Sequence, residues 1–228
     1  ADFDLHVIDL KLESWTQADW VKRLSGLADL NAHLTGDPTL PTSMRLEGDF
    51  SVKRGVLTGL PVLENLAEQT KTKEFTRLEL NTAKCHFYHQ GDIWQFSKIE
   101  IESRGLMRLE GYVNVTGNSV QGVLEVGVAP GRLRAIDGAE QRVFTRVDNG
   151  YKWAKPAMRI SGTLDNIQED LANRIKNAWF DQQIENVTEL AGKAPEAILE
   201  NGGKVMDIGT QVMAMGTNAA PDVLDTGV

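Results

Sequence analysis

Residues 45–52 read Arg-Leu-Glu-Gly-Asp-Phe-Ser-Val, and this phrase decides the fold class of the chain. Apolar residues or glycine alternate in it with polar or charged residues, which is the two-residue period of a strand with one apolar and one solvated face. The phrase returns at residues 108–115 as Arg-Leu-Glu-Gly-Tyr-Val-Asn-Val, and more loosely at residues 159–164 as Arg-Ile-Ser-Gly-Thr-Leu. The uneven spacing of the copies excludes a strict solenoid.

Turn signals separate further strand-like stretches on both sides of the phrase. Gly36-Asp37-Pro38 precedes it, Arg54-Gly55 follows it, and Asn149-Gly150 is a strong signal for a two-residue hairpin turn. In residues 3–13 the alternation changes phase, which indicates a bulge or burial on both faces. The strand spacing favours an antiparallel meander over alternating parallel units.

Helical spacing interrupts the strands twice and then takes over the end of the chain. Residues 16–24 and 60–70 predict short helices, and Pro61 suits the first turn of the second one. From Asn166 onward the apolar period is helical. We therefore expect a mainly β fold with helical additions (α+β): an antiparallel, meandering, curved or groove-like sheet in residues 1–165, a C-terminal helical segment in residues 166–217 and a flexible tail in residues 218–228.

Composition narrows the function classes. The chain has 228 residues and a formal net charge of -8, and it has no basic block that would neutralise nucleic-acid phosphates. Cys85 is the single cysteine, so no internal disulfide forms, although this does not decide the redox compartment. No run of about 18 apolar residues exists, so we expect any membrane anchor to lie outside this chain.

Residue types with catalytic or metal-binding potential are not arranged as a site. Cys85 and His89 share one strand face about 13 Å apart, while His86 points the other way, so these residues do not close a zinc shell. Glu100 and Glu102 lie on the solvated parity of a strand, and no nucleophile elbow, phosphate loop or dinucleotide motif is present. We therefore expect that this chain is not an enzyme and that it binds neither a metal ion nor a cofactor. Three tryptophans suggest a carbohydrate platform, but packing explains them better: Trp94, Trp153 and Trp179.

Four ordered stretches resemble the AsmA-like C-terminal domain family of AsmA/TamB-like bacterial envelope proteins: residues 47–67, 99–111, 122–130 and 160–164. The resemblance covers roughly residues 26–172. It implies a periplasmic domain, tethered to the inner membrane in the full-length protein, that carries phospholipid on a sheet groove or supports outer-membrane assembly. The chain departs from the family pattern because it lacks the anchor and the long repetitive strand region, and because its helical tail is longer.

The expected function is therefore an apolar sheet groove for phospholipid, with envelope proteins as further partners and no nucleic acid. A protein-interaction or structural module, whose sheet is filled by its own helices, is the alternative, and an enzyme of unknown type is the second. If the chain is an interaction or structural module, the helix at 60–70 covers the core of the sheet. If the sheet forms a lipid groove, this helix can also close one end of the groove. The expected lipid-binding residues are Leu46, Phe50, Val52, Leu109, Val113, Val115, Leu124, Val126 and Val128.

Overall fold

The computed structural model describes residues 2–14, 23–59, 61–70, 72–134 and 138–193. The chain forms two compact units, residues 1–179 and 180–228. The described part of the second unit is the C-terminal portion of helix α4 (Leu171–Lys193). Most of the helix expected at 16–24, the rest of the helical segment to 217 and the tail at 218–228 lie outside the described residues.

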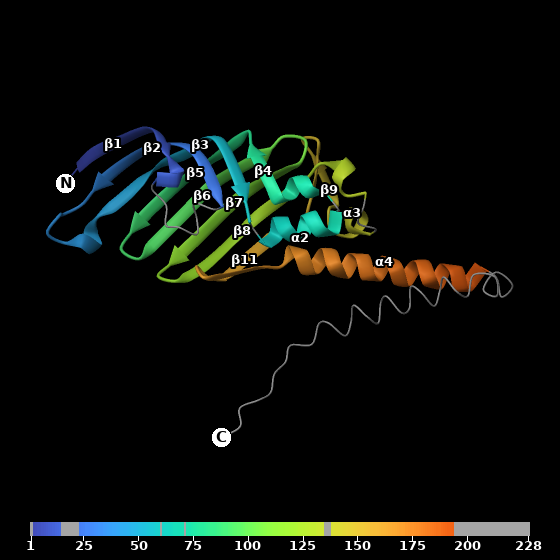
Figure 1. Ribbon diagram of the computed structural model, residues 1–228. Helices are drawn as coiled ribbons and strands as arrows, with labels where there is room; N and C mark the ends of the chain where they lie inside the picture. The colour runs from blue at the N-terminus through green and yellow to red at the C-terminus, as the bar shows by residue number, and fades with distance from the viewer. Residues whose placement is uncertain (1, 15–22, 60, 71, 135–137, 194–228) are drawn as a thin grey trace, which may run out of the picture. The chain divides into compact units, whose positions relative to one another are not determined.

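An open, antiparallel sheet dominates the first unit, as the alternating phrases predict (Figure 1). Each neighbouring pair along its main path from β1 to β8 is antiparallel, and each strand follows its neighbour along the chain except where β4 intervenes. The predicted fold class, mainly β with an antiparallel meander, is confirmed. The path runs through β1 (Asp2–Lys11), β2 (Leu24–Thr35), β3 (Arg45–Thr58), β5 (Thr82–Gln90), β6 (Ile93–Ser103), β7 (Met107–Thr116), β8 (Ser119–Val128), β10 (Tyr151–Trp153) and β9 (Arg146–Asp148).

Three short strands branch from this path. β4 (Arg77–Leu80) pairs with the end of β3. β11 (Met158–Thr163) pairs with β8 and with β12 (Asn166–Glu169). The helical pattern predicted from Asn166 is therefore wrong at its start, because residues 166–169 complete a hairpin with β11 and the helix begins at Leu171.

Helices pack at one end of the strands and form the core there (Figure 1). Leu63 and Leu66 of α2 (Pro61–Thr70) are buried in this core, so the prediction that this helix covers a core is confirmed. The first turns of α4 contribute Leu171 and Ile175 to the same cluster. The remaining helical pieces are α3 (Ala139–Arg142), η1 (Leu12–Ser14), η2 (Pro41–Ser43), η3 (Lys73–Thr76) and η4 (Pro130–Arg132).

The recurring phrase is explained by its glycines. A Cβ atom at Gly48 of β3 would lie 2.1 Å from a backbone carbonyl oxygen of β2. At Gly111 of β7 the corresponding distance, to an oxygen of β8, is 2.1 Å, and at Gly162 of β11, to an oxygen of β12, it is 2.3 Å. Any larger residue would push the neighbouring strand away, so all three copies need glycine for the same close strand approach.

Bulges keep apolar side chains on one face where the alternation changes phase. An extra residue lies in β1 between Val7 and Leu10, as one reading of the phase slip predicts, and Asp9 there has a φ of 54°. β6 has a bulge of the same kind at Lys98, which has a φ of 50°. The turn predicted at Arg54-Gly55 is wrong: Arg54, with a φ of 50°, is a bulge residue and β3 continues to Thr58.

The hairpin predicted at Asn149-Gly150 is confirmed. Both residues have positive φ, 50° and 80°, as the tight turn between β9 and β10 requires. The strand before the turn is short, because α3 ends at Arg142 and only Arg146–Asp148 pairs with β10.

Candidate functional site

The apolar face of the sheet consists of rows of side chains that run across the strands. Row 1 lies next to the turns that join β2 to β3, β5 to β6, β7 to β8 and β11 to β12. It crosses nine strands, so neighbouring strands at about 4.8 Å give it a length of about 38 Å. Its members are Phe3, Leu34, Leu46, His89, Trp94, Val115, Val120, Gly162 and Ile167.

Row 2 runs beside row 1, two residues further along each strand and therefore about 7 Å away. It contains two glycines, Gly48 of β3 and Gly122 of β8, between larger apolar residues. Its full membership is Leu5, Ala32, Gly48, Phe87, Phe96, Val113, Gly122 and Ile160. Rows 1 and 2 together are called the open half of the apolar face.

Described helices bury only the other end of this face. Four hydrophobic residues of the open half are buried, and none of them belongs to the core cluster to which α2 and α4 contribute: Ala32, Phe87, Val115 and Val120. At the β1 edge the open half is accessible to solvent, since Phe3 is 51% exposed and Leu5 is 39% exposed. Leu46, Trp94 and Phe96 are partly exposed. The open half is therefore exposed along part of its length and lies largely outside the helix-covered core, although Val113 and Ile160 of row 2 pack against that core.

Aromatic rings form the centre of the open half. The ring centroids of His89 and Trp94, which are cross-strand partners, are 4.0 Å apart. Trp94 also stacks on Phe96 at 5.9 Å and lies 6.4 Å from Phe87. Sequence reasoning missed this cluster. Its signal was present, because residues 87, 89, 94 and 96 are placed symmetrically about the turn at Gly91-Asp92, which brings them onto one face.

The nine lipid-binding residues expected from the sequence do not form one surface. Leu46 and Val115 belong to row 1, Val113 belongs to row 2, and Phe50 lies between the open half and the core. The other five are buried in the helix-covered core, where they are called the sealed residues: Val52, Leu109, Leu124, Val126 and Val128. Strand parity places all nine on one face, but the helices cover only one end of each strand.

Cys85 lies on the apolar face opposite Phe50, and burial raises the pKa of its thiol to about 11. His86 points to the polar face, where its ring nitrogens lie 3.1 Å from carboxylate oxygens of Glu47 and Asp49. Among the described residues, no group of three or more His, Cys, Asp or Glu side chains is placed to hold a metal ion. Cys85 is thus an unreactive thiol between apolar neighbours.

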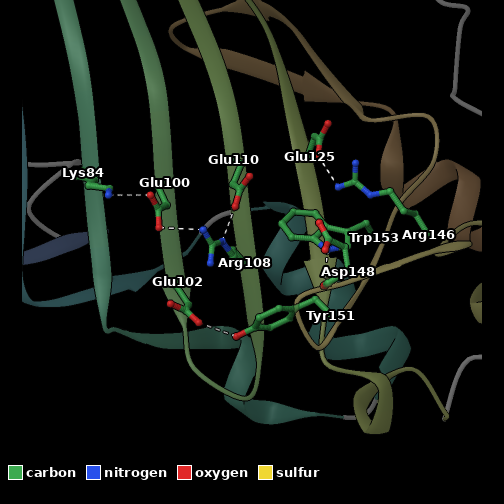
Figure 2. A network of polar contacts seen from close by, with 10 residues as sticks. All are labelled: Lys84, Glu100, Glu102, Arg108, Glu110, Glu125, Arg146, Asp148, Tyr151 and Trp153. Carbon is green, nitrogen blue, oxygen red and sulfur yellow. Dashed lines mark hydrogen bonds and ion pairs between the residues drawn. The ribbon is translucent and has the colours of Figure 1, made fainter.

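The opposite, polar face carries a chain of ion pairs (Figure 2). Lys84 Nζ lies 2.8 Å from Glu100 and holds the pKa of that carboxyl below its usual range. Arg108 Nη2 donates to Glu100 at 3.0 Å, and its Nε donates to Glu110. A shallow depression of about 420 Å³ beside these residues is also lined by Lys98. Glu100, Arg108 and Glu110 in this depression pair with one another, as on the solvated side of a two-faced sheet.

The β9–β10 hairpin is fastened to this polar face. Tyr151 donates its hydroxyl hydrogen to Glu102 at 3.0 Å, and Arg146 pairs with Glu125 while its guanidinium lies 4.9 Å from the ring centre of Trp153 (Figure 2). Trp153 is buried against Gly127, where a Cβ atom would lie 3.0 Å from the indole. Trp153 is thus a packing residue, as predicted, and it does not share a platform with Trp94.

Comparison with known proteins adds no relative. No family model matches the chain, and neither a curated protein nor a solved structure matches it. In the described part of the chain, no helix has both the length and the apolar character that crossing a bilayer requires. The resemblance to AsmA-like proteins stays a prediction, and the geometry of the open half is the basis for a function.

Proposed function

We propose that the open half holds the acyl chains of phospholipid, and that the chain is a non-enzymatic, AsmA-like module of the bacterial envelope. In this proposal the domain faces the periplasm and is tethered to the inner membrane through a segment outside this chain. The observation that carries the proposal is the open half itself: two adjacent apolar rows, with a central aromatic cluster, that lie largely outside the helix-covered core and contact it only through Val113 and Ile160.

Size and energy both suit an acyl chain. A bilayer has a hydrocarbon core of about 30 Å for two leaflets, so one tail is about 15 Å long and fits within the roughly 38 Å of row 1. Each methylene that leaves water gains about 0.8 kcal/mol. Acyl chains carry no hydrogen-bonding groups, and of the side chains in the open half only the imidazole of His89 and the indole of Trp94 have polar atoms.

The sealed residues favour a second candidate, a protein-interaction module. They show that the chain's own helices already fill one end of the apolar face, as that hypothesis expects. The two candidates differ in what the open half contacts: lipid tails in one case, and a partner's apolar side chains in the other. Direct detection of lipid next to Trp94 separates them.

Quenching of tryptophan fluorescence by phospholipid with brominated acyl chains provides that detection. Bromine quenches at short range, so lipid in the open half should quench Trp94 saturably and leave the buried Trp153 largely unaffected. Trp94→Phe is the matched control and should lose the largest share of the quenching. Native mass spectrometry of the purified protein should show bound phospholipid. Absence of both saturable quenching and bound lipid would refute the proposal and favour the interaction module.

A further inference from the structure

We propose that the open half selects phospholipids with neutral or amine-bearing headgroups and disfavours anionic headgroups. This inference rests on the proposed function, since it concerns where the headgroup lies when the tails occupy rows 1 and 2. The headgroup must remain in water, and the nearest exit from row 1 leads past the turns that border it.

The turns beside row 1 are called the rim, and they are close enough to contact a headgroup. Trp94 follows the β5–β6 turn by two residues, and Val115 precedes the β7–β8 turn by two. Two residues of a strand span about 7 Å, so a lipid whose tail contacts row 1 places its headgroup beside the rim. The rim consists of Gly36–Met44, Gly91-Asp92, Gly117-Asn118 and Leu164-Asp165.

Charge on the rim has one sign. Its charged residues are Asp37, Asp92 and Asp165, all of them exposed, and it contains no lysine or arginine. Asp37 accepts hydrogen bonds from the backbone N–H and the hydroxyl of Thr39 at 2.9 and 2.8 Å, which keep its carboxyl pKa low and its charge negative. A phosphate-bearing headgroup with net negative charge is repelled here, whereas an ammonium group is attracted.

The nearest cation does not reverse this field. Arg45 begins β3 directly after the rim, but its parity places it on the polar face with Glu47 and Asp49. The apolar face of the open half carries no lysine, arginine or carboxylate of its own. Headgroup preference at this site therefore follows from the three rim carboxylates.

The test compares two brominated phospholipids with identical acyl chains, one with an ethanolamine and one with a glycerol headgroup, by quenching of Trp94. For a headgroup beside the β5–β6 turn, Asp92 is adjacent, whereas Asp37 lies about 10 Å and Asp165 about 20 Å away along the rim at about 4.8 Å per strand. At low ionic strength the combined field of these carboxylates should make the ethanolamine lipid bind about four-fold more tightly, and the preference should disappear near 1 M salt. The variant Asp37→Asn/Asp92→Asn/Asp165→Asn keeps the acceptor oxygen of each side chain and should bind both lipids equally.

A charge-matched control replaces three exposed glutamates near the sealed residues, Glu64→Gln/Glu68→Gln/Glu79→Gln, and should keep the preference. Equal binding of both lipids by the unmodified protein at low salt, or tighter binding of the glycerol lipid, would overturn the headgroup inference and leave the proposed function standing. Failure of every brominated lipid to quench Trp94 would overturn both. The salt series needs no variant, so the test holds even where the triple aspartate variant folds poorly.

Discussion

Two leucines of the recurring phrase provide a matched test of where the open half ends. Leu46 and Leu109 occupy the same position of Arg-Leu-Glu-Gly, yet Leu46 lies partly exposed in row 1 while Leu109 is 4% exposed in the helix-covered core. The two copies point in opposite directions along the sheet, because β3 and β7 are related through the antiparallel pairings of β5 and β6. Replacing each leucine by aspartate should therefore give different results.

Leu109→Asp should unfold the protein. Losing the buried leucine side chain costs up to about 3 kcal/mol. Keeping the new carboxyl neutral in the core at pH 7 requires its pKa to rise from about 3.9 by about three units, which costs roughly 4 kcal/mol more. The sum of about 7 kcal/mol matches the total stability of a typical domain, which is about 5–15 kcal/mol.

Leu46→Asp should leave the protein folded and weaken lipid binding. Its carboxylate reaches water at the rim end of β3, so the expected loss of unfolding free energy is about 1 kcal/mol, from the partly buried leucine alone. In the open half, however, the charge must be desolvated by any tail that covers it. Quenching of Trp94 by brominated phospholipid should fall at least ten-fold. Leu46→Asn, which is uncharged and similar in shape, should retain more binding than Leu46→Asp.

Urea unfolding followed by circular dichroism measures stability, and pH provides a further check. In the folded Leu109→Asp protein the pKa of the introduced carboxyl would be raised, so its penalty is fully present above that raised pKa and is relieved below the unfolded pKa of about 3.9. Leu109→Asp should thus recover stability relative to the unmodified protein as the pH falls from the raised pKa towards about 4. A folded Leu109→Asp protein with lost lipid binding would place the sealed residues in the groove, and an unfolded Leu46→Asp protein would make row 1 a core.

Three further results are expected. Gly48→Ala should lower the free energy of unfolding by about 3 kcal/mol or more, because its Cβ would lie 2.1 Å from a carbonyl oxygen. Gly91→Ala, with a φ of 59° and open space around it, should lower it by about 1 kcal/mol in the same urea assay. Equal losses would contradict the close strand approach at Gly48. A hydrogen bond to Asp4 raises the pKa of His33. The interaction of His33 with Asp4 therefore stabilises the fold fully below pH 6.5, and this contribution disappears as the pH rises through the raised pKa. An NMR titration that places the pKa of His33 at or below its usual value would disprove this interaction. With its thiol pKa raised to about 11, Cys85 should react with iodoacetamide at pH 8 about two hundred-fold more slowly than a free cysteine. Bound phospholipid should slow this reaction further. Rapid alkylation would show that the apolar face around Cys85 is accessible to solvent.

The sequence predicted the sheet well because its strands are long and its period is regular. The phase slip in residues 3–13 indicated a bulge, which β1 has at Asp9. The same signal at Arg54 was interpreted as a turn, because a basic residue before glycine ends many strands and nothing local shows that Val56 and Leu57 continue the pairing. A bulge differs from a turn only in what the next residues contact, and that is a long-range property.

The site was predicted only in part, for a reason that the two leucines illustrate. Parity assigns a residue to a face, and it placed Leu46 and Leu109 correctly on the same one. It does not tell which end of the strand a helix covers, because the direction in which each copy of the phrase runs depends on the pairing of the whole sheet. The aromatic cluster around Trp94 was missed although its signal was present, because recognising it requires taking the turn at Gly91-Asp92 as the centre that sets the register of Phe87 with Phe96.

The uncovered rows require an explanation beyond folding. β3 is 14 residues long and spans about 45 Å, whereas a helix such as α2 is about 10 Å across, so the described helices cover one end of the apolar face only. Folding alone would allow polar residues at the exposed positions of rows 1 and 2, where they would reduce aggregation. The chain instead keeps Phe3, Leu46, Trp94 and Phe96 there, at a cost in solubility. That cost is offset if a water-insoluble ligand or partner occupies the open half, and rim carboxylates at Asp37, Asp92 and Asp165 favour a ligand whose polar end is not anionic.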